Sequence, residues 1–157
     1  MYLNAGGALR TLLHHQGNFL IVGGVNALLI GAPVVTFDLA IVHDRSQENV
    51  ERLLTALDAM DARYRARPEL RPAASHLLSP GHQLLATKFG ALDVLGMIGD
   101  NHTYLDLLPS AILLELEPGL DVPMLSAAAL LAEKRAMNRN KDASAISWLQ
   151  AIVERQP

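Results

Sequence analysis

Residues 19–43 read FLIVGGVNALLIGAPVVTFDLAIVH, and this stretch decides the fold. It begins with four apolar residues that are typical of a buried strand, and the pair Gly23 and Gly24 ends that strand. The apolar residues 25–30 predict a short helix, which a glycine and a proline bring to an end. A second strand is expected over residues 34–43, so a tight turn and a helix connect two strands.

The glycine pair and the second strand both carry residues with a chemical use. Gly23 and Gly24 allow the backbone to approach a phosphate closely, and the start of the following helix presents unpaired N–H groups. A plain tight turn is the alternative. In the strand, side chains alternate between two faces, which places Asp38, Ala40 and Val42 on the same side.

Asp93 repeats the pattern of Asp38, since each is an aspartate inside an apolar strand. Such a carboxylate must be paired, hydrogen-bonded or bound to a metal to offset its desolvation, and Mg²⁺ prefers hard oxygen ligands of this kind. Contacts within the protein could also satisfy both carboxylates. A predicted hairpin turn at Gly90-Ala91 places Lys88 opposite Asp93, which allows an ion pair, and a hydrogen bond to backbone would satisfy Asp38.

The remaining pattern mixes hairpins with helices. Helices are expected at residues 8–15, at 127–137 and 143–154, and after a cap within residues 44–46. Hairpins are expected from residues 83–89 with 92–98 and from 112–116 with 120–124, and a loop at 68–80. Strict alternation of strand and helix is absent, so we predict one α+β domain over residues 1–157, with helices packed on a mixed sheet and a helical C-terminus.

Composition narrows the function classes. The chain has 157 residues and no cysteine, and the absence of cysteine excludes a thiolate metal site. Its formal net charge of −3 argues against broad binding to duplex DNA. Arg63, Arg65 and Arg67 alternate with other residues and are interpreted as a solvated strand edge or a local basic patch. Glycine, proline and aspartate interrupt the apolar residues 19–42, so we expect no membrane span and a cytoplasmic protein.

The order and spacing of these motifs resemble those of the polymerase-beta-type nucleotidyltransferase superfamily. Its pattern is a strand, a Gly-Gly or Gly-Ser turn, a helix, and then Asp-hydrophobic-Asp in the next strand. Over residues 19–153 the chain is similar to small bacterial members, including relatives of AbiEii-type toxins and the minimal nucleotidyltransferases of toxin–antitoxin systems. Further matches are Thr36-Phe37-Asp38, Leu92-Asp93-Val94-Leu95, Lys134 and Arg139-Asn140-Lys141-Asp142.

The resemblance implies Mg²⁺-dependent transfer of a nucleotidyl group from a nucleoside triphosphate to a protein or RNA acceptor, with a possible toxin–antitoxin partner. It implies that Asp38 and Asp93 are metal ligands. The nucleotide-binding residues that it implies are Gly23, Gly24, Asn26, Thr36, Lys134, Arg139 and Lys141. For the last three, a solvated loop between helices, with Asp142 as a helix cap, is the alternative.

Ala40 departs from the family pattern, because it stands where the second aspartate of the Asp-x-Asp motif is expected. A methyl group cannot bind Mg²⁺, so catalysis is expected to be impaired and activity is expected for an Ala40→Asp form. Two possibilities follow. The chain is either an inactivated form of an enzyme or a natural member that kept the fold to bind a nucleotide or a partner without turnover.

Overall fold

A seven-stranded mixed sheet forms the centre of the structure, a computed structural model that describes residues 2–155. Its strands are β1 (Phe19–Val22), β2 (Asp38–His43), β3 (Arg63–Tyr64), β4 (His82–Thr87), β5 (Gly90–Leu95), β8 (Ala111–Glu117) and β9 (Leu120–Leu125). They lie in the order β3-β4-β5-β2-β1-β9-β8. β2 pairs with β5 and β1 with β9 in parallel, and the other pairs are antiparallel. The predicted mixed sheet is therefore confirmed.

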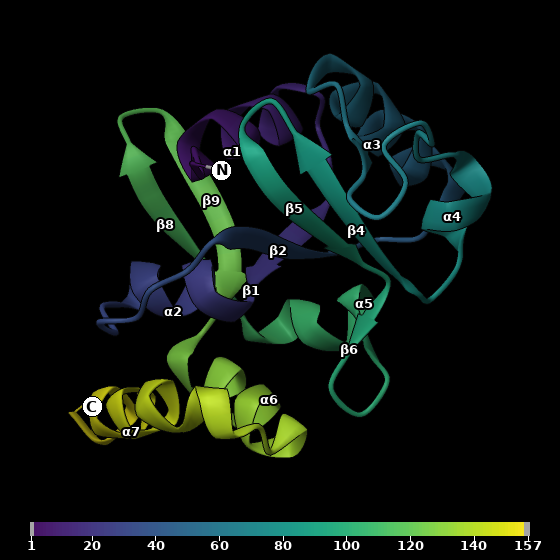
Figure 1. The fold of residues 1–157 in the computed structure, drawn as a ribbon. Coiled ribbons are helices and arrows are strands. Elements are labelled where there is room, and N and C mark those ends of the chain that lie inside the picture. The colour runs from purple at the N-terminus through teal and green to yellow at the C-terminus, as the bar shows by residue number, and fades with distance from the viewer. Residues whose placement is uncertain (1, 156–157) are drawn as a thin grey trace.

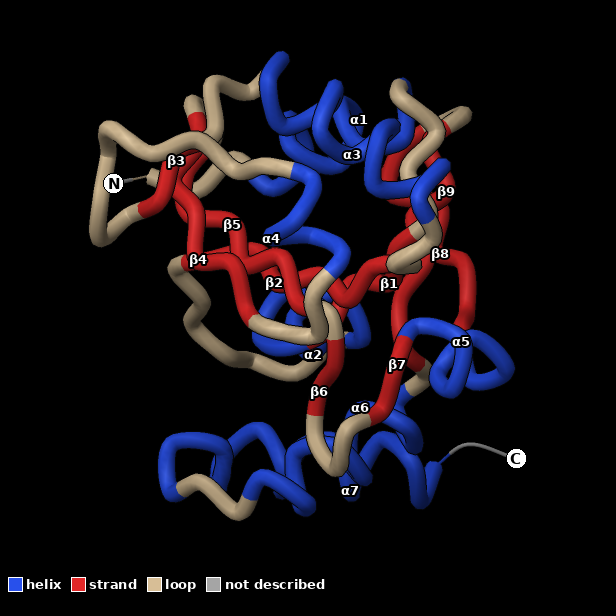
Figure 2. Tube along the Cα trace, turned by 90° about the vertical axis from the view of Figure 1, so that its right-hand side faces the viewer, coloured by secondary structure: helices blue, strands red, loops and turns tan. Residues whose placement is uncertain are grey.

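Helices cover both faces of this sheet (Figures 1 and 2). They are α1 (Ala5–His14), α2 (Gly23–Ile30), α3 (Gln47–Ala59), α4 (Ala74–Leu78), α5 (Tyr104–Leu107), α6 (Ala127–Met137) and α7 (Ala143–Arg155). One core joins the sheet to α1, α3 and α4, and a second core joins it to α2, α5, α6 and α7. None of the helices within residues 2–155 is long and apolar enough to cross a membrane.

The alternation predicted for β2 is confirmed by its burial. Leu39 and Ile41 are buried in the core of α1 and α3, whereas Val42 is buried in the core of α2 and α6. Asp38 and Ala40 share the face of Val42 and are less buried. The start of β2 thus presents a carboxylate and a methyl group on the side of the sheet that carries α2.

Local signals gave several element boundaries correctly. β1 and α6 have the predicted bounds, and the Ser126 hydroxyl caps α6 by accepting a hydrogen bond from the Ala129 N–H. Ser46 caps α3 in the same way. Four expectations need correction. α1 begins at Ala5 rather than at residue 8, and α2 begins at Gly23 rather than at residue 25. β2 begins only at Asp38 rather than at residue 34, and the predicted loop over residues 68–80 contains α4.

The hairpin of β4 and β5 turns two residues earlier than predicted. Thr87 pairs with Gly90, so Lys88 and Phe89 form the turn and Gly90 follows it with a φ of 115°. This register places Leu84, not Lys88, opposite Asp93. The predicted ion pair between Lys88 and Asp93 is therefore wrong.

A second, two-stranded sheet follows β5 and was not predicted. It consists of β6 (Met97–Ile98) and β7 (His102–Thr103), which pair antiparallel just before α5. β7 lies near α6, because His102 Nδ1 is 2.5 Å from the Glu133 carboxylate. That pair ties the hairpin to the C-terminal helices.

Candidate active site

Asp38 and Asp93 lie together because their strands are neighbours. In the parallel register of β2 and β5, Asp38 pairs with Ala91 and Ala40 pairs with Asp93, so both carboxylates rise from the same face two residues apart. Burial and then the adjacent Asp38 carboxylate raise the pKa of Asp93 to about 6, against the opposing effect of Arg65. Two acidic groups from separate parts of the chain therefore share one site.

Arg65 is the partner of Asp93. Its Nη2 donates a hydrogen bond to Asp93 Oδ1 at 2.7 Å, and its Nη1 donates to the Leu85 carbonyl oxygen, also at 2.7 Å. The sequence singled out Arg65 only as part of an alternating basic run. The pairing depends on how β3 and its following residues align with β4, and no local pattern encodes that alignment.

Ala40 completes the group at the position expected for a carboxylate. It lies beside Asp93 in the register, and its Cβ is 3.5 Å from the place that a Cβ on Gly23 would occupy. A carboxylate at position 40 would thus stand between the glycine turn and Asp93. In its place the chain offers a methyl group, which has no ligand atom.

The glycine turn opens α2 with a backbone that only glycine adopts readily. Gly23 has a φ of 69° and is the first residue of the helix, and the capping position before it, Val22, makes no side-chain hydrogen bond to the helix start. Gly24 lies against Thr36, whose hydroxyl donates a hydrogen bond to the Asp38 carbonyl oxygen at 3.0 Å. The turn, Thr36 and Asp38 are therefore adjacent, and N–H groups of the helix start have no side-chain cap.

Replacing Gly24 with alanine is expected to lower the free energy of unfolding by about 1–3 kcal/mol. A Cβ there would lie 2.7 Å from Thr36 Oγ1 and 3.0 Å from Thr36 Cβ, so the segment before Asp38 would have to move. Denaturant unfolding measures the change. Gly6, the second residue of α1, is the matched control, because its Cβ would meet its nearest atom at 3.5 Å and Gly6→Ala should be neutral or stabilising. Equal effects at both positions would contradict the close packing of Gly24.

Asn26 has a structural role. It is fully buried, its Nδ2 donates to the Leu125 carbonyl oxygen at 3.0 Å, and its Oδ1 accepts from the Leu125 N–H at 3.2 Å. Both ends of the amide therefore bind the end of β9. Asn26, which was predicted to bind a nucleotide, thus holds α2 against β9.

Two of the cations near the C-terminal helices pair with the same acid, Asp142. The buried Lys134 Nζ is 3.3 Å from Asp142 Oδ1, and Arg139 Nε is 2.6 Å from Asp142 Oδ2. Lys141 is exposed. Asp142 lies at the end of the 3-10 turn Asn140–Asp142, directly before α7, and its pair with Lys134 joins this turn to α6. Two of the three predicted triphosphate-binding cations are thus paired with Asp142, the buried Lys134 and the exposed Arg139.

The side chains around Asp38 and Asp93 offer few oxygen ligands for a magnesium ion. Within residues 2–155, no group of three or more histidine, aspartate or glutamate side chains is arranged to hold a metal ion. A resident two-metal centre does not fit this site, since Ala40 offers no ligand atom beside Asp38 and Asp93. A pair of carboxylates does fit one Mg²⁺ whose other ligands come from phosphate groups, because Mg²⁺ is commonly held by one or two carboxylates together with substrate phosphates.

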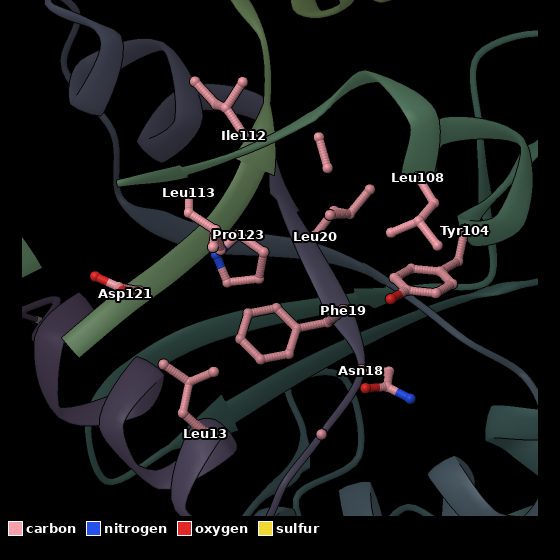
Figure 3. Close-up of a pocket in the computed structure, with 12 residues that line it drawn as sticks. Leu13, Asn18, Phe19, Leu20, Tyr104, Leu108, Ile112, Leu113, Asp121 and Pro123 are labelled. Carbon is pink, nitrogen blue, oxygen red and sulfur yellow. The ribbon is translucent and has the colours of Figure 1, made fainter. Parts of the chain in front are cut away.

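A separate hollow of about 370 Å³ lies between α1, β1, α5 and the β8–β9 hairpin (Figure 3). Leu13, Phe19, Leu108 and Pro123 are among its mainly apolar lining residues. Neither Asp38 nor Asp93 lines it. It therefore lacks the paired acids on which the candidate active site is built.

Comparison with known proteins places the fold. No protein-family model and no curated protein matches the chain. The solved structure of the lincosamide antibiotic adenylyltransferase LnuA, with lincomycin bound, is similar with a TM-score of 0.67 and 13% sequence identity, over 97% of this chain and 99% of that chain. A Thermotoga maritima protein described as a candidate nucleotidyltransferase is similar with a TM-score of 0.55 and 16% identity, over 97% and 91% of the two chains. The chain therefore has the α+β fold of nucleotidyltransferases.

Proposed function

We propose that this chain binds a nucleoside triphosphate with Mg²⁺ and transfers its nucleotidyl group to an acceptor, at a rate that Ala40 reduces. The observation that carries this proposal is the convergence of Asp38 and Asp93 on neighbouring parallel strands, beside the turn of Gly23 and Gly24. Paired acids next to uncapped N–H groups suit a ligand that brings both a cation and phosphates. The nucleotidyltransferase fold supports the same ligand class.

Each group has a distinct task in this proposal. Asp38 and Asp93 would hold the one Mg²⁺, which neutralises phosphate charge and polarises the phosphoryl group under attack. Gly23 and Gly24 give the phosphates access to the backbone N–H groups at the start of α2. Thr36 fixes the backbone at Asp38 through its hydrogen bond to the Asp38 carbonyl oxygen.

The acceptor is proposed as a hydroxyl group of a protein, an RNA end or a small molecule. The first two classes come from the resemblance of the sequence to small bacterial nucleotidyltransferases. The third is added because LnuA is a lincosamide adenylyltransferase with lincomycin bound in its structure. The link to AbiEii-type toxins and a toxin–antitoxin partner stays a prediction.

Binding without turnover is the second candidate function. Two observations favour it, namely the methyl group of Ala40 at the ligand position and the ion pair that already occupies Asp93. Under this alternative the fold is kept to hold a nucleotide or a partner protein. Both candidates require nucleotide binding, and only the first requires transfer.

Calorimetric titration with nucleoside triphosphates, with and without Mg²⁺, tests the shared requirement. We expect Mg²⁺-dependent binding, and we expect Asp38→Asn to weaken it by about 10-fold or more, because a charged ligand contact is worth about 1.5–3 kcal/mol. The control is Asp121→Asn, which removes an exposed aspartate from β9 and should leave binding unchanged. Absence of binding, or equal binding by both variants, would contradict the proposed site.

A further inference from the structure

The proposed site needs cations for its ligand, and two of the three predicted ones, Lys134 and Arg139, are paired with Asp142. A nucleoside triphosphate carries several negative charges, which proteins usually meet with arginine or lysine. Lys134 and Arg139 both bind Asp142 in the C-terminal cluster. Among the described residues, the basic side chain that forms an ion pair with the paired acids is Arg65.

Arg65 is held firmly by two different groups. One guanidinium nitrogen donates to a backbone carbonyl of β4 and the other to Asp93, each at 2.7 Å. Because a peptide carbonyl on a paired strand cannot swing away, the guanidinium is fixed in place as well as neutralised. A fixed guanidinium loses little conformational entropy when it binds a further acceptor.

The guanidinium also keeps donors for a ligand. It carries five N–H groups, and its hydrogen bonds to Leu85 and Asp93 use two of them. The Arg65 side chain is 34% exposed, and Leu84, the neighbour of Asp93 across the register, is exposed as well. Its remaining N–H donors thus lie at a solvent-accessible edge of the site, next to Asp93, the proposed metal ligand to which Arg65 is hydrogen-bonded.

The charge balance points the same way. Asp38 and Asp93 supply two negative charges, which suit one divalent cation but repel phosphate when that cation is absent. Arg65 adds one positive charge on the β4 side of Asp93, and Ala40 adds no negative charge on the β2 side. The site of this chain is therefore less acidic than a three-carboxylate site and better suited to phosphate.

We propose that Arg65 is a phosphate-binding residue, which contacts a non-bridging oxygen of the nucleoside triphosphate while it stays paired with Asp93. This inference rests on the proposed function, because it assigns the anion contact within the same site. It replaces the C-terminal cations with a residue of the β3–β4 region. Arg65 thereby acts on the ligand directly and not only by orienting Asp93.

The test must separate direct phosphate contact from positioning of Asp93. Calorimetric titration with adenosine triphosphate is therefore carried out on four proteins: the unaltered chain, Arg65→Gln, Asp93→Asn, and the double variant. If Arg65 binds phosphate, Arg65→Gln weakens binding by about 10-fold or more, and it weakens binding again by at least about 5-fold in the Asp93→Asn background. If Arg65 only positions Asp93, the second substitution has no further effect, and the inference is overturned.

Two controls complete the test. Arg67→Gln removes a neighbouring arginine that is 70% exposed and paired with Glu69, and it should leave binding unchanged. Titration with adenosine, which has no phosphate, should show no difference between the unaltered chain and Arg65→Gln. Circular dichroism and thermal unfolding establish that each variant is folded, and Arg65→Lys, which keeps the charge, should bind with intermediate affinity.

The outcomes for the two proposals are distinct. If the unaltered chain binds adenosine triphosphate and Arg65→Gln binds it equally well, the role of Arg65 is wrong and the proposed function stands. If no nucleoside triphosphate binds the unaltered chain with or without Mg²⁺, the proposed function fails and the role of Arg65 fails with it.

Discussion

Ala40→Asp is expected to raise the rate of nucleotidyl transfer by about 100-fold or more. The new carboxylate would stand beside Asp93 in the β2–β5 register and close to Gly23, and would complete a set of three acids. A metal ion contributes several kcal/mol to transition-state stabilisation, and each 1.36 kcal/mol is about a tenfold change in rate. Transfer from labelled nucleoside triphosphates in the presence of Mg²⁺, with cell RNA, cell protein and lincomycin as acceptors, measures the gain.

Ala40→Asn is the matched control, because asparagine has nearly the size of aspartate without its charge. It should leave the rate near that of the unaltered chain. Ala40→Asp should also be less stable than the unaltered chain without Mg²⁺, since three neighbouring carboxylates repel one another, and should recover stability when Mg²⁺ is added. If Ala40→Asp binds nucleotide and transfers nothing to any acceptor, binding without turnover becomes the better description of the protein.

The largest loss of stability is expected from Asp142→Ala, at about 3–5 kcal/mol. This substitution leaves the ammonium group of Lys134, whose side chain is only 6% exposed, without its carboxylate partner. It also frees Arg139 and removes the ion pair between α6 and the turn that leads into α7. Denaturant unfolding followed by circular dichroism measures the free energy of unfolding.

Asp58→Ala is the control for this experiment, because Asp58 pairs with Arg71 at the surface and its side chain is 80% exposed. Exposed ion pairs contribute about 0–1 kcal/mol, so this variant should unfold almost as the unaltered chain does. If Asp142→Ala costs no more than Asp58→Ala, the buried cluster does not stabilise the C-terminal helices.

The same cluster predicts how stability depends on pH. Burial would raise the pKa of Asp142, but Arg139 and Lys134 outweigh burial and hold the pKa below its ordinary value of 3.8. A lowered pKa in the folded state means that the stabilisation is fully present above pH 3.8 and is lost as the pH falls through the folded pKa. Asp142→Asn should therefore flatten the dependence of stability on pH in that acidic range.

The sequence predicted those features that local patterns encode. The apolar run that forms β1 and the serine cap that starts α6 each depend on a few consecutive residues, and both elements have the predicted bounds. The first residues of the candidate site could be predicted from the sequence for the same reason. Gly23 and Gly24 mark a turn, and Asp38 is conspicuous in its apolar strand.

Features that depend on alignment between distant segments were not predictable in this way. Because the turn is formed by Lys88 and Phe89, each residue of β5 has a different partner on β4 from the one predicted. Lys88 is therefore not opposite Asp93. Arg65 pairs with Asp93 across 28 positions of sequence, through a strand edge that only two residues of β3 define. Asn26 looked available to a ligand because its partner, Leu125, lies 99 positions away.

The place of β1 in the sheet has a consequence for protein synthesis. β1 hydrogen-bonds to β2 on one side and to β9 on the other, and β9 is made about a hundred residues after β1. Until residue 125 leaves the ribosome, the apolar strand Phe19–Val22 has an unpaired edge of the kind that promotes aggregation. Gly23, Gly24, Asp38 and Asp93 are all synthesised before β9, so the exposed edge of β1 persists until after these residues have been made.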